Sequence, residues 1–178
     1  LTLTPTAHGT RRTACQADAV RTVYLAGPDV FRPDAVEVGR AKVARCAELG
    51  VRGRYPLDAD LPDGLDGAAL AHAIFESCLA MMDGADAAVV DLTPFRGVSD
   101  DVGTAVELGY LLARGIPCHG HTDAADDYAS RVHAAGSEPV GWQVEDFGLA
   151  DNLMVEGALR RSGGSFTRTP GWAGFDTA

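Results

Sequence analysis

The stretch Ala87-Ala-Val-Val-Asp-Leu92 decides the fold class. It is apolar until Asp91, as expected of a central parallel strand that is covered by helices on both faces. A helical pattern precedes it over residues 68–82, and another follows over residues 102–114 and ends at Gly115. Helix and strand therefore alternate around this stretch, which favours an α/β fold with an open, mostly parallel sheet.

The alternation continues in both directions along the chain. Further strands are predicted at residues 22–26, 51–57, 116–119 and 140–144, and further helices at residues 33–50, 123–135 and 152–160. The pattern from residue 162 onward is glycine-rich and weak. Ligands of such sheets bind beyond the carboxyl ends of the strands, so we expect the functional residues just after the strands.

The composition narrows the class of partner. The chain has 178 residues, a formal net charge of −10 and 46% hydrophobic residues, which is typical of one globular domain. Lys42 is the single lysine, whereas nucleic-acid binders usually present a basic patch. Nucleic acids and anionic membrane surfaces are therefore disfavoured, and an uncharged small-molecule substrate fits the charge better.

The ends and the cysteines predict a domain boundary and a compartment. Residues 1–20 are rich in Thr, Ala and Arg and lack the apolar core of a secretory signal. We expect a disordered extension there, followed by one domain over residues 21–178. The four cysteines are widely spaced and form no CxxC pair, which is typical of reduced thiols in a cytoplasmic protein.

A first candidate cluster, Tyr24-Leu-Ala-Gly27-Pro28-Asp-Val-Phe31, follows the strand at residues 22–26. Glycine lets the backbone turn and approach a ligand closely. Neither a GxGxxG fingerprint nor a Walker-type phosphate loop is present, so neither a dinucleotide nor an ATP site is indicated. The cluster alone also fits a plain turn that follows a buried tyrosine.

A second cluster, Asp91-Leu-Thr-Pro-Phe95-Arg96-Gly97, follows the central strand. A carboxylate at the end of an apolar strand is costly to bury unless it is paired, so Asp91 needs a partner or a ligand. Arg96 is the nearest candidate partner. This stretch alone fits either a substrate contact or an ion pair that closes the loop.

A third cluster, Asp101-Val-Gly103-Thr-Ala-Val-Glu107-Leu-Gly109, opens the helix predicted at residues 102–114. Asp101 stands at the N-cap position. Gly103 costs about 1 kcal/mol relative to alanine, which makes sense where a ligand lies against the first turn. Glu107 projects from the face that Gly103 leaves bare, and the helix dipole favours its ionised form. The alternative is an ordinary solvent-exposed glutamate.

A fourth cluster, Asp151-Asn152-Leu153-Met154, begins a further helix, for which Asp151 or Asn152 suits the N-cap. Alone it reads as a cap followed by a core leucine. The pair His119-Gly-His121 is too short to hold a metal by itself, so no metal site is predicted.

Together, the four clusters resemble the nucleoside 2-deoxyribosyltransferase family over roughly residues 23–155. Four motifs in order and at compatible separations are more specific than any one of them. The resemblance implies a flavodoxin-like or Rossmann-like single domain, in which helices flank a five-stranded, mostly parallel sheet. It also implies chemistry that needs no cofactor or metal.

The resemblance further implies roles for individual residues. Glu107 matches the nucleophile that forms a covalent deoxyribosyl-enzyme, Tyr24 matches a tyrosine that orients it, and Asp101 matches an aspartate that helps the base leave. Asn152 matches an asparagine that binds the sugar 5′-hydroxyl, in many members across a subunit interface, and Met154 matches a methionine that lines the site. Further substrate contacts are expected from Gly27, Pro28, Phe31, Asp91, Phe95, Arg96 and Gly103.

Two features depart from the family pattern. Cys78 stands where an Asn or Asp commonly faces the base, which leaves the preference for purines or pyrimidines open. The chain also ends at Gly174-Phe-Asp-Thr-Ala178 rather than in the usual aliphatic helix, so no role is assigned to a C-terminal carboxylate.

These inferences predict an enzyme of nucleotide salvage that moves a 2-deoxyribosyl group between a 2′-deoxynucleoside and a free nucleobase, with some hydrolysis by water. A dimer-based homo-oligomer is expected if Asn152 acts across an interface. One alternative is an N-glycoside hydrolase of deoxynucleosides or nucleoside 5′-monophosphates, in which Arg32 would attract a phosphate and Asp29 would repel it. The other is a non-catalytic nucleotide-sensing module.

Overall fold

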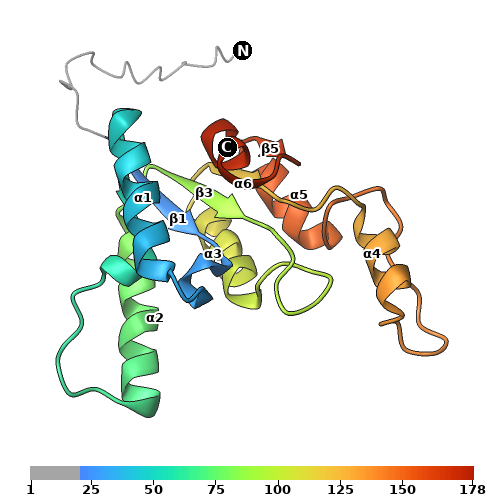
Figure 1. Ribbon diagram of the computed structural model, residues 1–178, viewed down its shortest axis with the longest axis horizontal. Helices are drawn as coiled ribbons and strands as arrows, with labels where there is room; N and C mark the ends of the chain where they lie inside the picture. Colours follow the sequence, from blue (N-terminus) through green and yellow to red (C-terminus); the bar gives the residue numbers. More distant parts are fainter. Residues whose placement is uncertain (1–20) are drawn as a thin grey trace, which may run out of the picture.

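The computed structural model describes residues 21–178, so the extension predicted over residues 1–20 lies outside the described residues. Five parallel strands form one sheet in the order β2-β1-β3-β4-β5, which is the flavodoxin-like order (Figure 1). The predicted fold class is therefore confirmed. The strands are β1 (Thr22–Ala26), β2 (Arg52–Arg54), β3 (Ala87–Asp91), β4 (Cys118–His121) and β5 (Phe166–Thr167).

Helices cover both faces of the sheet. The helices are α1 (Ala35–Glu48), α2 (Gly67–Asp83), α3 (Val102–Ala113), α4 (Tyr128–Ala135), α5 (Leu153–Arg161) and α6 (Gly171–Thr177), with short 3-10 turns at Pro28–Phe31 and Pro56–Asp58. The buried side chains place α2, α3 and α5 on one face, and α1 and α6 on the other. α4 lies apart from the sheet, at the opposite end of the molecule from α1 and α2 (Figure 1).

Side chains of the central strands alternate between these two layers. Tyr24 and Ala26 of β1 pack toward α2, α3 and α5, whereas Leu25 packs toward α1 and α6. Met82 and Leu108 complete the first layer, and both are almost fully buried. Since β3 is buried in the same way, its apolar run is explained by the two layers of helices.

The last strand is not where the sequence pattern predicts it. Residues 140–144 form a turn and an extended loop, in which Val140 is fully exposed and Trp142 is 75% exposed. The fifth strand is instead β5, which pairs with β4 through two residues only. Two residues are too few to show an alternating pattern, which explains why the prediction is wrong. None of the described helices is long and apolar enough to cross a membrane.

Candidate functional site

The site is organised around a contact between β1 and α3. The Tyr24 hydroxyl donates a hydrogen bond of 2.6 Å to Oε1 of Glu107, although the two residues are 83 positions apart. Tyr24 is fully buried because its ring packs in the core between the sheet and its helices. The predicted proximity of Tyr24 and Glu107 is therefore found in the structure.

The environment of Glu107 differs from the expectation based on the helix dipole alone. Burial raises the pKa of Glu107 to about 7, while the Tyr24 hydroxyl opposes this rise and the nearby Asp101 carboxylate adds to it. The pKa of Tyr24 lies well above its usual range, because of burial and the adjacent Glu107. Tyr24 thus remains a donor, and Glu107 exchanges its proton near neutral pH rather than staying ionised throughout.

Cys78 of α2 is the third member of this group. Its thiol lies close enough to Tyr24 and Glu107 for both to act on its pKa, which burial raises above the ordinary value. The thiol is therefore a neutral neighbour of the carboxylate. The position where the family pattern commonly has Asn or Asp is thus next to Glu107 in this chain.

The first turn of α3 is closed by Asp101, as predicted. Its Oδ2 accepts hydrogen bonds from the Thr104 backbone N–H at 3.0 Å and from the Thr104 hydroxyl at 3.3 Å. A Cβ atom on Gly103 would lie 2.8 Å from the same Oδ2. Gly103 therefore has a local explanation, since it leaves room for the capping carboxylate.

The loop after β3 folds over the loop after β1. The rings of Phe31 and Phe95 stack with centroids 5.0 Å apart, and the Arg96 guanidinium lies 4.9 and 4.6 Å from their centroids. Arg96 adopts a positive φ of 55° to reach this position. The predicted pairing of Arg96 with Asp91 is wrong, because Arg96 is drawn to the aromatic faces instead.

Asp91 is buried at the end of β3 and turns toward the opposite face of the sheet from Glu107. Its Oδ1 accepts the Thr93 backbone N–H at 2.9 Å and lies 3.8 Å from Nδ1 of His121. A Cβ atom on Gly27 would lie 2.8 Å from the Asp91 Cβ, so Gly27 serves the close approach of β1 and β3.

A cleft of about 240 Å³ at this edge of the sheet gathers several residues that the sequence singles out. Its walls include Pro28, Phe31, Asp91 and Phe95. Glu107 is not among the residues that line it. Within residues 21–178, no three His, Cys, Asp or Glu side chains lie together as metal ligands would.

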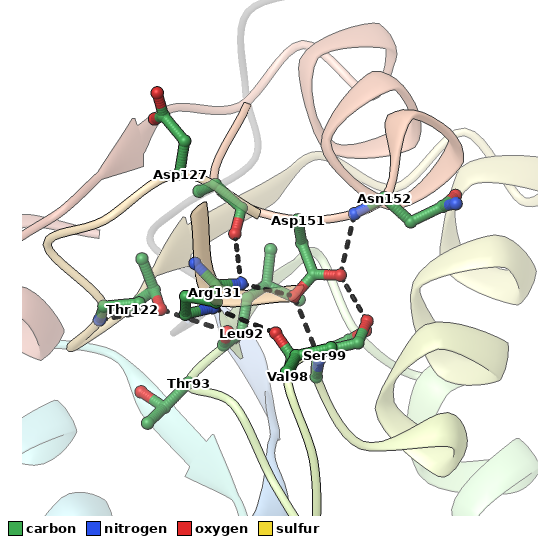
Figure 2. Close-up of polar contacts among 12 residues, drawn as sticks. Leu92, Thr93, Val98, Ser99, Thr122, Asp127, Arg131, Asp151 and Asn152 are labelled. Carbon is green, nitrogen blue, oxygen red and sulfur yellow. Dashed lines mark hydrogen bonds and ion pairs between the residues drawn. The ribbon is translucent and has the colours of Figure 1, made fainter. Parts of the chain in front are cut away.

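Asp151 and Arg131 form a clamp that the sequence does not reveal (Figure 2). Asp151 is 1% exposed and accepts hydrogen bonds from the Ser99 hydroxyl, from the Asp100 backbone N–H at 3.0 Å and from the Asn152 backbone N–H at 2.7 Å. Arg131 of α4 approaches it at 3.5 Å. The clamp thereby holds the residues before α3 against those before α5.

Arg131 extends the clamp through backbone carbonyls. It donates to the carbonyl of Val98 at 2.9 Å and to those of Asp126 and Ala150 at 2.6 Å each. Three segments that are distant in the sequence are joined in this way (Figure 2). The sequence signal that could have suggested it is a carboxylate, Asp151, directly before the cap residue Asn152.

Asp100 lies beside this clamp and was also missed from the sequence. It is 7% exposed, and its Oδ2 has no hydrogen-bond partner among residues 21–178. Burial, together with the neighbouring Asp151 carboxylate, raises the pKa of Asp100 to about 7. A second group that exchanges protons near neutral pH therefore adjoins Asp101.

Asn152 caps α5, as one of the two predicted alternatives. Its Oδ1 accepts the Met154 backbone N–H at 2.9 Å, and its Nδ2 donates to Oε1 of Glu145 at 2.6 Å. The other Glu145 oxygen accepts the Leu153 backbone N–H at 2.9 Å. The Met154 side chain is 71% exposed, so within one chain it lies on the surface.

The clamp predicts a large loss of stability when Arg131 is replaced. Arg131→Met should lower the free energy of unfolding by about 3 to 5 kcal/mol, because it leaves the buried Asp151 carboxylate without its cation. Denaturant unfolding monitored by circular dichroism measures this. Arg114→Met is the control, since Arg114 pairs with Asp83 on the surface and should contribute at most about 1 kcal/mol. Equal losses for the two variants would contradict the clamp.

The raised pKa of Glu107 predicts a stability difference that depends on pH. A carboxyl group whose pKa is higher in the folded state than in the unfolded state lowers the free energy of unfolding once the pH exceeds the unfolded-state pKa. For Glu107 this loss reaches its full size above about pH 7. Glu107→Gln should therefore have a higher melting temperature than the wild type at pH 8.5, and the difference between the two proteins should be smaller at pH 5. The change in this difference corresponds to at most about 3 kcal/mol. Glu37→Gln, at an exposed position of α1, should behave alike at both pH values. A pH-independent effect of Glu107→Gln would contradict the burial argument.

Comparisons with known proteins identify the family of this chain. The family model for nucleoside 2-deoxyribosyltransferase matches residues 23–154. An uncharacterised protein of Schizosaccharomyces pombe is 35% identical over 172 residues, which cover 84% of this chain and 82% of that protein. The structure of a 2-desoxiribosyltransferase from Leishmania mexicana is similar, with a TM-score of 0.66 and 31% identity over 88% of this chain and 95% of that one.

Two further structures share the fold. A conserved protein from Enterococcus faecalis has a TM-score of 0.54 and 24% identity over 85% of this chain and 92% of that one. A 2-deoxyribosyltransferase from Bacillus psychrosaccharolyticus has a TM-score of 0.50 and 18% identity over 67% of this chain and 93% of that one. The family match spans well over half of the chain and includes Tyr24, Glu107 and Asn152. The chain therefore belongs to the nucleoside 2-deoxyribosyltransferase family.

Proposed function

We propose that this protein transfers the 2-deoxyribosyl group of a 2′-deoxynucleoside to a free nucleobase, with Glu107 as the nucleophile. The bond of 2.6 Å from the Tyr24 hydroxyl to Glu107 carries the proposal, because it orients one carboxylate oxygen and leaves the other for the sugar. Membership of the family supports this reaction, as does the similarity to the Leishmania mexicana protein that is named for it.

The reaction consists of two displacements at C1′. First, a Glu107 oxygen bonds to C1′ while the bond from C1′ to the base nitrogen breaks, and Asp101 gives a proton to the departing base. Next, a nitrogen of the second base attacks C1′, the bond to Glu107 breaks, and Asp101 takes up the proton that this nitrogen loses. Both steps pass through an oxocarbenium-like transition state, and two inversions retain the configuration. Water in place of the second base gives hydrolysis.

The remaining residues bind the substrate in this proposal. Asn152 binds the 5′-hydroxyl, and Met154 lines the site near the sugar. The stacked rings of Phe31 and Phe95 offer a flat surface for a base, and Arg96 holds the two rings together. The other expected contacts come from Gly27, Pro28 and Gly103. Asp91 is left out, because its side chain turns toward the face of the sheet opposite to Glu107.

The charges near the loop after β1 favour a nucleoside over a nucleoside 5′-monophosphate. Arg32 donates two hydrogen bonds to Asp34, at 2.9 and 3.1 Å, and Lys42 lies 2.6 Å from Asp29. Both cations are thus engaged by carboxylates, whereas a phosphate site needs cations that are free to bind it. A non-catalytic sensing module does not require a desolvated carboxylate, such as Glu107, that is oriented by the hydroxyl of a buried tyrosine, Tyr24.

Replacing Glu107 tests the proposed chemistry. Glu107→Ala and Glu107→Gln should each lower kcat by roughly 10³-fold or more, because one residue forms the covalent bond. Asp101→Asn should be milder, and mildest for substrates whose bases leave easily. Mass spectrometry of the wild-type protein with a deoxynucleoside should show a deoxyribosyl adduct that both Glu107 variants lack. Near-normal turnover by Glu107→Gln would contradict the proposal. Formation of free deoxyribose, rather than a new deoxynucleoside, when a second base is present would favour the hydrolase.

We also propose that the active site is completed by a second copy of the chain. Val102 and Val106 of α3 are 79% and 61% exposed, and Met154 at the start of α5 is 71% exposed. The N-terminal ends of α3 and α5 adjoin, because Asp151 joins the residues before them. An exposed apolar strip therefore lies beside Asn152, as expected of a surface that a symmetric partner covers.

Mixing two inactive variants tests this arrangement. Glu107→Ala and Asn152→Ala should each be inactive as homo-oligomers. Co-expression of the two should restore about a quarter of the wild-type sites, since half of the dimers are mixed and each mixed dimer holds one intact site. No recovery in verified mixed dimers, or a fully active monomer in sedimentation, would show that Asn152 acts within its own chain.

A further inference from the structure

A second polar cavity lies on the face of the sheet opposite to Glu107. It has a volume of about 180 Å³, is open to solvent on one side, and lies between the turn after β1, α1, the ends of β3 and β4, and α6. The residues that matter for its chemistry are Lys42, Asp91, His121, Asp123, Trp172 and Phe175. None of the proposed catalytic residues lines this cavity, which adjoins the cleft of about 240 Å³ and shares Asp29, Arg32, Asp91 and Asp123 with it.

His121 points to a polar ligand. It is 3% exposed, and neither of its ring nitrogens has a hydrogen-bond partner among residues 21–178. Burial lowers the pKa of His121, although Asp91 opposes the shift, so the ring is neutral and offers one donor and one acceptor. Leaving such buried groups unsatisfied is destabilising. A ligand that accepts one hydrogen bond and donates another would remove this cost.

The charges around the cavity favour a ligand with N–H donors over an anion. Lys42 is held by Asp29 at 2.6 Å and lies over the Phe175 ring, 5.2 Å from its centroid. Asp91 and Asp123 each use Oδ1 for a backbone N–H, at 2.9 and 2.8 Å, and within residues 21–178 no hydrogen bond reaches their Oδ2 atoms. Two carboxylate oxygens therefore remain as acceptors, while both lining cations are engaged, Lys42 by Asp29 and Arg32 by Asp34.

The size and walls of the cavity favour a flat ring. Trp172 and Phe175 of α6 meet edge to face, with centroids 5.5 Å apart, and form an aromatic wall. A cavity of about 150 Å³ is known to hold a benzene ring, so about 180 Å³ suits one ring of a heterocycle. A purely apolar ring would leave His121 unsatisfied, which excludes simple hydrocarbons.

We propose that this cavity binds the amino-bearing edge of a free nucleobase, cytosine or adenine, at a site separate from Glu107. The ring lies against Trp172, the amino group donates to Asp91 or Asp123, and His121 completes the contacts. Thymine and hypoxanthine are disfavoured because they present carbonyl oxygens to the carboxylates. The choice among heterocycles rests on the proposed function, since free bases are its second substrate. Such a site keeps a base at the sheet edge where transfer takes place.

Fluorescence of Trp172 reports on this cavity without any need for activity. The chain has two tryptophans, and Trp142 is 75% exposed in the loop after α4, so Trp142→Phe makes Trp172 the sole emitter. Titration of this variant with cytosine and adenine should give saturable quenching. Thymine and hypoxanthine should bind at least tenfold more weakly. Absence of saturable quenching by all four bases would overturn the proposal and leave the cavity to water.

Two variants in the same background decide which residues bind the base. His121→Phe should weaken cytosine and adenine at least tenfold, while His119→Phe should change nothing, because His119 bonds Ser165 instead. If circular dichroism shows that His121→Phe does not fold, Asp123→Asn serves as the test instead. This substitution adds a hydrogen-bond donor, so it should shift the binding preference toward thymine and hypoxanthine. Quenching that none of these changes alters would refute the site. Glu107→Gln should retain full quenching, so failure of the transfer proposal is distinguishable from failure of this one.

Discussion

Parallel pairing of β1 with β3 sets where the polar groups of this protein lie. The register places Tyr24 opposite Ala88, and Gly27, which lacks a Cβ atom, lets the ends of the two strands approach closely. Because side chains alternate along a strand, Tyr24 turns toward α3 while Asp91 turns toward α1 and α6. One sheet edge therefore carries two polar regions on opposite faces. The strand order reverses between β1 and β3, since β2 lies on one side of this pair and β4 and β5 lie on the other. The loops after β1 and β3 therefore leave the sheet in opposite directions.

The first of these regions depends on the balance between burial and hydrogen bonding at Glu107. Burial disfavours the carboxylate and the Tyr24 hydroxyl favours it, so the group is held close to the point of proton loss at neutral pH. In the proposed reaction, such a carboxylate has few water contacts to lose as positive charge develops at the sugar carbon. Fixed partners of this kind stabilise a transition state without reorganisation.

Long-range hydrogen bonds then hold the loops that surround Glu107. Asp151 accepts from residues before α3 and before α5, and Arg131 joins both to α4. These bonds consequently join the two helix N-termini that carry Asp101 and Asn152. Along this edge Lys42 pairs with Asp29 and Arg32 pairs with Asp34, while Arg96 lies over the rings of Phe31 and Phe95.

Much of the fold follows from local pattern. The apolar run of β3, the N-cap at Asp101 and the alternation of helix and strand are features of neighbouring residues, and they were sufficient to predict an open, mostly parallel sheet. The number of five strands came from the resemblance to the family. The pairing of Tyr24 with Glu107 was reachable only through the resemblance of four motifs to a family. Nothing in the spacing of two residues 83 positions apart requires a contact. β5 was missed because two residues carry no period.

Tertiary structure alone decided the partners and the charges. The sequence suggested Arg96 as the partner of Asp91, yet Arg96 lies over two aromatic rings and Asp91 faces His121. The raised pKa of Glu107, the clamp at Asp151 and the cavity at His121 all arise from burial by segments that are distant in the chain. Local sequence determines backbone preferences, because these depend on a few adjacent residues. The desolvation of a charge depends on everything that packs around it, and that is defined only once the chain has folded.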